Sequence, residues 1–366
     1  MHVPFVDLKS QYHTIKTDID NAINGVINEA SFIGGAAVKQ FEKDFSKLLY
    51  VKHCIGVANG TDAIYITLKM LGVGPGDEVI TTALSWISTS ETISQTGAKP
   101  VFVDIDLETY TINPEQIENK ITHRTKAIIP VHLYGQAAHI SKIKALCLKY
   151  DLFLIEDCAQ AHLTEEHGEL AGSFGVASTF SFYPGKNLGA YGDAGAVITN
   201  DDALAEKIRM YANHGALKKH EHNMEGINSR LDAIQAAILS VKAKHLSEWT
   251  DKRIRNALLY FEYLKDAKVT LPVIRAKTKH TFHLYVIRYE RRDQLRAFLE
   301  KRGIQTAIHY PTALPFLPAY AYLNHVPQDF PVAYRYTKEI LSLPMFPELT
   351  NEQIKYVCDA IKSFCA

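Results

Sequence analysis

Lys186 is the first residue whose surroundings suggest chemistry. It lies in the turn YPGKN (183–187), directly after an apolar run that ends at Phe182. A lysine on a tight turn at the end of a buried strand is partly desolvated, which lowers the pKa of its amine and makes that amine a nucleophile toward carbonyl groups. A solvated lysine in a surface turn would have the same local sequence, so this segment alone leaves both interpretations open.

A carboxylate stands at the end of a second apolar run. Asp157 directly follows residues 152–156, and Gln160 comes soon after it. Burying a carboxylate is costly unless the group is paired. A cationic ring nitrogen, a metal ion, a structural arginine or a helix cap would each satisfy Asp157, and the segment does not choose among them.

The segment Asn59-Gly60-Thr61-Asp62 follows a third apolar run and opens a helical pattern. Glycine lets the backbone come close to a ligand, and Thr61 offers a hydroxyl. The unpaired N–H groups and the dipole at a helix start favour an anion such as a phosphate. The same four residues also suit an ordinary capped helix.

These residues belong to an alternation of strands and helices. Nearly continuous apolar runs, separated by helical patterns of ten or more residues, predict a parallel sheet covered on both faces, which is an α/β fold. Ligands bind beyond the carboxyl ends of such strands, where all three segments fall. The expected strands are 54–58, 78–82, 100–105, 126–134 and 152–157, and the expected helices are 36–50, 63–71, 88–96 and 140–150.

The pattern changes after about residue 203. Two helical stretches are expected at 203–214 and 231–265, followed by short strands at 269–273 and 281–289, a helix at 292–303 and a proline-rich segment at 309–318. We therefore expect two domains. The large domain covers residues 1–240 with an N-terminal helical segment, and a smaller C-terminal α+β domain covers residues 241–366.

Composition excludes several classes of protein. The 366 residues carry 40 Lys+Arg and 40 Asp+Glu, a balance that argues against binding to nucleic acid. No apolar run reaches the roughly 18 residues that a membrane span needs. The five cysteines are scattered without a CxxC, so we expect no disulfide framework, no metal site and a reducing compartment, the cytoplasm.

The order and spacing of the motifs carry a family resemblance. The segments FIGG (32–35), GVANGTDA (56–63), IEDCAQAH (155–162), FSFYPGKNLGAYGDAGA (180–196) and GINSRLDAIQAAIL (226–239) span most of the chain. Together they resemble the DegT/DnrJ family of sugar-nucleotide aminotransferases, in the aspartate aminotransferase superfamily. The resemblance implies fold type I and the cofactor pyridoxal 5′-phosphate (PLP), with pyridoxamine phosphate as its intermediate form.

The resemblance also implies a role for each matching residue. Lys186 is similar to the lysine that forms the aldimine and moves the proton, and Asp157 to the partner of the pyridine nitrogen. Gln160 would face the ring hydroxyl, and Trp86 would stack on the ring. Gly60, Thr61 and Ser181 match the phosphate site. Asn228 resembles the asparagine that reaches the cofactor of a second subunit, which implies a homodimer with shared active sites.

The substrate that the resemblance implies is a keto sugar linked to a nucleotide. Tyr183, His309 and Tyr310 would contact the sugar, and Lys219, or its neighbour Lys218, would contact the diphosphate. The expected reaction moves the amino group of L-glutamate to C3 of a dTDP-3-keto-6-deoxyhexose, giving the 3-amino-3,6-dideoxyglucose or its galactose epimer. A UDP-linked 3-keto sugar and a 4-keto sugar are the alternatives.

Two other classes share this fold. A PLP-dependent sugar dehydratase would carry histidine in place of Lys186, so the lysine argues against it. A non-catalytic regulator would not need the set of Lys186, Asp157 and Gln160, and no appended DNA-binding segment is visible in the sequence.

Overall fold

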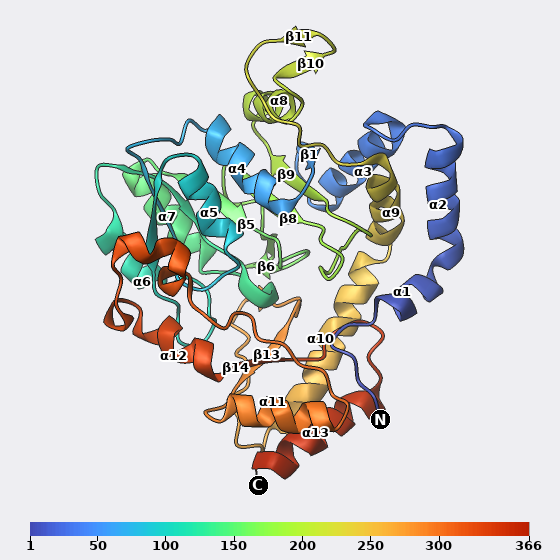
Figure 1. Cartoon of the computed structure of the whole chain (residues 1–366), viewed down its shortest axis with the longest axis vertical. Helices are drawn as coiled ribbons and strands as arrows, with labels where there is room; N and C mark the ends of the chain where they lie inside the picture. Colours follow the sequence, from blue (N-terminus) through green and yellow to red (C-terminus); the bar gives the residue numbers. More distant parts are fainter. Residues whose placement is uncertain (366) are drawn as a thin grey trace.

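A seven-stranded sheet forms the centre of the molecule (Figure 1). The computed structural model describes residues 1–365. The strand order is β1-β9-β8-β5-β4-β2-β3. The strands are β1 (His53–Val57), β2 (Glu78–Thr82), β3 (Lys99–Val103), β4 (Thr125–Ile129), β5 (Phe153–Asp157), β8 (Ala177–Ser181) and β9 (Gly195–Thr199).

The predicted α/β sheet, mostly parallel, is confirmed. Neighbouring strands from β3 to β8 run parallel. The exception is β9, which lies antiparallel between β1 and β8. Both of these neighbours lead to residues singled out above, since β1 precedes Gly60 and β8 ends at Ser181.

Helices cover the sheet, and most of them begin and end close to their predicted limits. They are α3 (Gly35–Leu48), α4 (Gly60–Met70), α5 (Ser88–Gln95), α6 (Pro114–Ile117), α7 (Ile140–Tyr150) and α8 (Asp202–Tyr211). Before them come α1 (Leu8–Thr14) and α2 (Lys16–Asn28), and α2 and α3 pack against α9 (Ala233–Ala243).

The long helix expected at 231–265 is interrupted. It divides at Lys244 and His245 into α9 and α10 (Leu246–Leu264). The His245 ring stacks on Trp249 with centroids 5.5 Å apart. Residue 240, the predicted domain boundary, lies within α9. The boundary itself stays a prediction.

The C-terminal part packs on α10 around its own core. It contains β13 (Tyr285–Arg288), β14 (Ile340–Leu343), α11 (Arg292–Lys301), α12 (Pro331–Glu339) and α13 (Asn351–Cys365). The strand expected at 269–273 is wrong, because only Thr270 pairs there, with Arg288. The start of the chain also belongs to this core, through the fully buried Val3.

Short strands complete the structure. The strands β6 (Glu165–Glu166), β7 (Glu169–Leu170) and β12 (Thr278–Lys279) form one small sheet, and β10 (Ala216–Lys218) and β11 (Glu221–His222) form a hairpin. All five cysteines are buried and free. Within residues 1–365, no helix combines the length and the hydropathy needed to cross a membrane.

Candidate active site

A cavity of about 580 Å³ lies at the carboxyl ends of the central strands. Every residue that we predicted for the site lines it, apart from Lys219 and Asn228. The lining residues from that prediction are Gly60, Thr61, Trp86, Asp157, Gln160, Ser181, Tyr183, Lys186, His309 and Tyr310. The sheet therefore gathers segments that are up to 250 positions apart in the chain.

The turn after β8 holds Lys186 in this cavity. The Lys186 N–H donates to the Tyr183 carbonyl at 2.8 Å, and the Ala190 N–H donates to the Phe182 carbonyl at 2.7 Å. Burial lowers the pKa of the Lys186 amine to about 8, against an opposing effect of Asp157. About a tenth of the amine is therefore neutral and nucleophilic at pH 7, far more than for a lysine with an ordinary pKa.

Asp157 ends β5 and is 4% exposed. Its carboxylate accepts a hydrogen bond from the Thr89 hydroxyl at 2.8 Å and one from the Ala159 N–H at 3.1 Å. Burial raises the pKa of Asp157, although these donors and the Lys186 charge oppose that rise. Because the carboxylate has only these two hydrogen bonds within the described chain, a cationic group bound in the cavity would stabilise its charged form.

The start of α4 approaches the end of β8 very closely. The Asn59 side chain caps the helix by accepting from the Asp62 N–H at 2.8 Å. A Cβ added to Gly60 would lie 2.7 Å from the Ser181 Cβ, so only glycine allows this approach. The Thr61 hydroxyl contacts the Ser88 hydroxyl at 2.7 Å. Helix N–H groups and hydroxyls in one place suit a phosphate.

Gln160 lines the cavity and connects the segment after β4 with the C-terminal part of the chain. Its side-chain oxygen accepts from the Tyr134 N–H at 2.7 Å, and its amide nitrogen contacts the Tyr310 hydroxyl at 3.0 Å. The Trp86 ring lies 5.8 Å from the Tyr310 ring and is 60% exposed. Trp86 thus presents an aromatic surface to the cavity.

His309 is neutral in this setting. Burial and the Lys186 charge lower its pKa to about 4. The His309 Nδ1 lies 2.9 Å from the Ser342 hydroxyl, and this contact leaves the other ring nitrogen for a ligand. The Tyr310 pKa is raised, chiefly by burial, so its hydroxyl keeps its proton.

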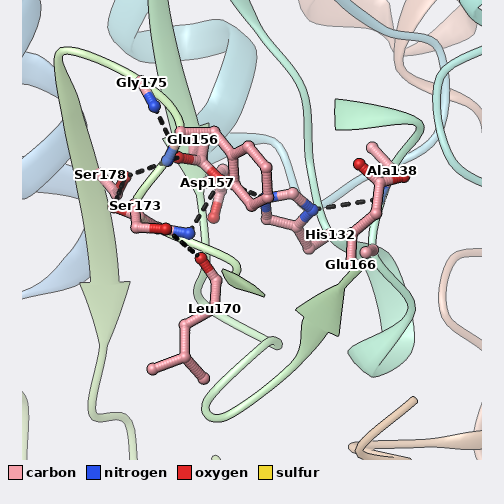
Figure 2. A network of polar contacts seen from close by, with 12 residues as sticks. His132, Ala138, Glu156, Asp157, Glu166, Leu170, Ser173, Gly175 and Ser178 are labelled. Carbon is pink, nitrogen blue, oxygen red and sulfur yellow. Dashed lines mark hydrogen bonds and ion pairs between the residues drawn. The ribbon is translucent and has the colours of Figure 1, made fainter. Parts of the chain in front are cut away.

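A buried polar network connects the end of β5 with the loop before β8 and with the segment after β4 (Figure 2). Glu156, fully buried, accepts from the N–H groups of Gly172 and Phe174 at 2.8 Å and of Gly175 at 2.9 Å. The His132 Nε2 lies 3.0 Å from the same carboxylate. Burial raises the pKa of Glu156, but these donors outweigh it and hold the pKa below its ordinary value.

Both ring nitrogens of His132 have partners, because its Nδ1 accepts from the Ala138 N–H at 3.0 Å. Nε2 therefore carries the proton and donates to Glu156. The Cys158 sulfur lies within 4.8 Å of these ligand atoms, an arrangement that could hold a metal ion. The hydrogen bonds already account for His132 and Glu156.

The sequence did not point to Thr89, Phe5 or Val6, which also line the cavity. Thr89 follows Trp86 by one helical turn, so the helix face next to Trp86 was the available signal. Phe5 and Val6 had no comparable signal, because their neighbours in the cavity come from the far end of the chain.

Lys219 and Asn228 lie outside the cavity of this single chain. Both are exposed. Lys219 lies between β10 and β11, which project beyond α8 at the end of the molecule opposite α11 and α13 (Figure 1). The predicted role of Asn228 requires a second chain, so its position here does not test that role.

Comparison with known proteins places this geometry in a family. Residues 13–362 match the family model of the DegT/DnrJ/EryC1/StrS aminotransferases. The crystal structure of S. venezuelae DesV in complex with a ketimine intermediate superimposes with a TM-score of 0.97. It is 40% identical to this chain, and the match covers 100% of this chain and 98% of DesV.

Curated relatives with different names match over nearly their whole length. A pleiotropic regulatory protein of Geobacillus stearothermophilus is 48% identical, covering 100% of this chain and 99% of its own. A dTDP-3-amino-3,6-dideoxy-alpha-D-galactopyranose transaminase of Aneurinibacillus thermoaerophilus is 41% identical, covering 99% of each chain. A UDP-N-acetyl-3-dehydro-alpha-D-glucosamine 3-aminotransferase of Acidithiobacillus ferrooxidans is 42% identical, covering 98% of this chain and 97% of its own. The chain therefore belongs to the DegT/DnrJ/EryC1/StrS family of PLP-dependent aminotransferases, which act on sugar nucleotides.

Proposed function

We propose that the protein transfers the amino group of L-glutamate to C3 of a dTDP-3-keto-6-deoxyhexose by ping-pong chemistry. The observation that carries this proposal is the single cavity that Lys186, Asp157 and the start of α4 share. The name of the A. thermoaerophilus relative supports a 6-deoxy sugar aminated at C3. Both the glucose and the galactose epimer of the product fit the proposal.

The residues around the cavity suit PLP at both of its charged ends. Asp157 is a buried carboxylate that forms no ion pair within residues 1–365. The protonated ring nitrogen would be its cationic partner. The close approach at Gly60, with the hydroxyls of Thr61 and Ser181, would hold the phosphate. When bound, PLP supplies an electron-withdrawing ring that stabilises negative charge at the substrate carbon.

We assign the proton movement to Lys186. Its Nζ has a lowered pKa, so it would carry a proton between the substrate carbon and C4′ of the bound cofactor, the shift that transfer of an amino group requires. Asp157 would hold the ring nitrogen of the bound cofactor and favour its protonated form. Gln160, held by Tyr134 and Tyr310, would face the ring hydroxyl, and Trp86 would stack on the ring.

We assign the sugar contacts to Tyr183, His309 and Tyr310. Neutral His309 and protonated Tyr310 are hydrogen-bonding groups without charge, which suits hydroxyl and keto oxygens. Lys219 is proposed to contact the diphosphate only when a second chain is present, because it is remote from the cavity of its own chain. The homodimer, with Asn228 completing the partner's phosphate site, is part of the same proposal. We also propose a cytoplasmic location, because all five cysteines are free.

The absorbance of the holoenzyme tests the aminotransferase reaction. L-Glutamate should convert the spectrum of bound PLP to that of the amine form, and added 3-keto sugar nucleotide should restore it. The Lys186→Ala variant should lose this conversion, whereas the control variant Lys244→Ala, at an exposed lysine of the α9–α10 junction, should keep it. A wild-type spectrum that glutamate does not change would refute the proposal and favour a regulatory role like that named for the G. stearothermophilus relative.

The nucleotide and the sugar carbon are tested by substrate comparison. Chemically prepared 3-keto and 4-keto sugars, each linked to dTDP or UDP, are offered with glutamate, and the products are identified by mass and NMR. We expect the dTDP-3-keto sugar to react fastest. A UDP-linked 3-keto sugar is the second candidate, because the A. ferrooxidans relative carries that specificity in its name. Equal turnover of a 4-keto sugar would contradict the assignment to C3.

A further inference from the structure

Four aromatic rings form a continuous row along the cavity. The ring centroids are 5.8 Å apart between Trp86 and Tyr310, 5.5 Å between Tyr310 and His309, and 5.7 Å between His309 and Phe5. All four residues line the cavity, and they come from three distant parts of the sequence. Phe5 stands at one end of the row and is separated by His309 from Tyr310, whose hydroxyl contacts Gln160.

The start of the chain holds Phe5 firmly in that place. The Val3 N–H donates to the Gly303 carbonyl, and the Gln305 N–H donates to the Val3 carbonyl, each at 2.9 Å. The Phe5 N–H donates to the Gln305 side chain at 3.1 Å. The Phe5 ring then stacks on His309 at an interplanar angle of 24°. These contacts fix a side chain near the N-terminus as a wall of the cavity.

The chemistry of this wall is apolar and uncharged. Val6, next to Phe5 in the sequence, also lines the cavity. Among the lining residues of the described chain, the charged side chains are Lys186, Asp157 and Asp193, and no arginine is present. An aromatic face packs well against C–H groups, but it offers no conventional hydrogen bond to a hydroxyl or a carboxylate.

In a pyranose ring that offers C3 to Lys186, C5 is separated from C3 by C4, so its C6 substituent projects away from the reacting carbon. The C6 methyl group of a 6-deoxyhexose is the one purely apolar substituent of the ring, and Phe5 and Val6 are the apolar part of the lining that matches it. We propose that Phe5 is a specificity-determining residue whose ring packs against the C6 methyl group of the sugar and selects a 6-deoxyhexose over a sugar with a 6-hydroxyl. This inference rests on the proposed function, since it assumes amination at C3.

The test uses two stable amino sugars that differ only at C6. The holoenzyme is given dTDP-3-amino-3,6-dideoxyglucose or dTDP-3-amino-3-deoxyglucose as amino donor, with 2-oxoglutarate as acceptor, and glutamate formation is measured. We expect the wild type to use the 6-deoxy compound with a kcat/KM about tenfold higher or more, the discrimination that one buried apolar group provides. In Phe5→Ser this ratio should fall toward one, mainly through a higher KM for the 6-deoxy sugar.

Two further variants separate specificity from folding. Phe5→Leu keeps an apolar wall and should keep most of the preference. Phe298→Ser removes an aromatic residue of α11 that packs on Phe364 with centroids 5.0 Å apart and does not line the cavity. It should leave the ratio unchanged.

The outcomes distinguish this inference from the proposed function. An equal ratio in the wild type and in Phe5→Ser, with both sugars consumed, would overturn the role of Phe5 alone. A wild-type preference for the 6-hydroxyl compound would also overturn it. If glutamate converts the cofactor but neither amino sugar is consumed, the proposed substrate fails and the inference falls with it.

Discussion

At the scale of single residues, burial sets the charge of the groups that would do the chemistry. It lowers the pKa of Lys186 and of His309 and raises the pKa of Asp157. The sequence pointed to Lys186 and Asp157 because each stands at the end of an apolar strand. It could not point to Phe5, whose stacking partner His309 is brought near only by the complete fold.

Lys186 should react with electrophiles at a lower pH than an ordinary lysine. The neutral amine is the reactive form, and its fraction rises as the pH passes through the pKa, which is about 8 here and 10.5 for an unperturbed lysine side chain. Acetylation of the apoenzyme at a series of pH values, read by peptide mass spectrometry, should show Lys186 half-labelled near pH 8. In Asp157→Asn the midpoint should move lower, because the Asp157 charge raises the pKa of Lys186. A midpoint near pH 10 would contradict this prediction.

Gly60→Ala should weaken PLP binding. The added Cβ would meet Ser181 at 2.7 Å, so the start of α4 must move away from β8. We expect an affinity loss of about 1–3 kcal/mol, the usual cost of overpacking a tight contact. Titration of the apoenzyme with PLP measures it. The matched control is Gly25→Ala in α2, where a Cβ meets nothing within 4 Å. The control should leave affinity unchanged, and equal effects of both variants would refute the role of Gly60.

At the scale of elements, the site depends on how strand ends are held together. Glu156 ties the end of β5 to the loop before β8, through Gly172, Phe174 and Gly175, and to His132 after β4 (Figure 2). The apolar runs predicted these strands well. They did not predict β9, which is not among the expected strands, and they carry no information on its antiparallel direction, because direction depends on the connecting turn and not on the pattern of burial.

Glu156→Gln should destabilise the fold. Every contact of this carboxylate is with a donor, so the amide group of glutamine would face N–H groups that it cannot satisfy. We expect a loss of about 2–5 kcal/mol in the free energy of unfolding, measured by urea denaturation. Glu118→Gln is the control, since that glutamate contacts Lys149 and Tyr150 at the surface, and it should change stability little. Similar losses in both variants would contradict the prediction.

At the scale of the whole molecule, the sequence predicted the α/β fold class correctly, and the division into a large and a small domain stays a prediction. The sequence did not predict the break between α9 and α10, because the helical pattern of 231–265 continues through it. The sequence also did not predict that Val3 joins the C-terminal core. A single short apolar segment gives no indication of which distant core it will join.

A mixture of two inactive variants should regain activity if the proposed dimer shares its sites. In a hybrid of Lys186→Ala and Asn228→Ala chains, one site combines an intact Lys186 with an intact Asn228 from the other chain. After subunit exchange at equal amounts, activity should recover to about a quarter of the wild-type value. Light scattering should report a dimer for each variant alone. Absence of recovery in verified hybrids would show that Asn228 does not act across the interface.

The five buried thiols have a practical consequence for following this protein in solution. Burial raises the pKa of Cys147 and Cys358 to about 12 and that of Cys54 and Cys158 as well, so the native chain holds these sulfurs unionised and out of reach of reagents. Their alkylation then requires the surrounding core to open. Cys358 lies in the C-terminal core, and Cys158 lies in the core cluster that includes residues of α3 and α9. The rates of alkylation at the two cysteines would therefore measure the opening of each region separately.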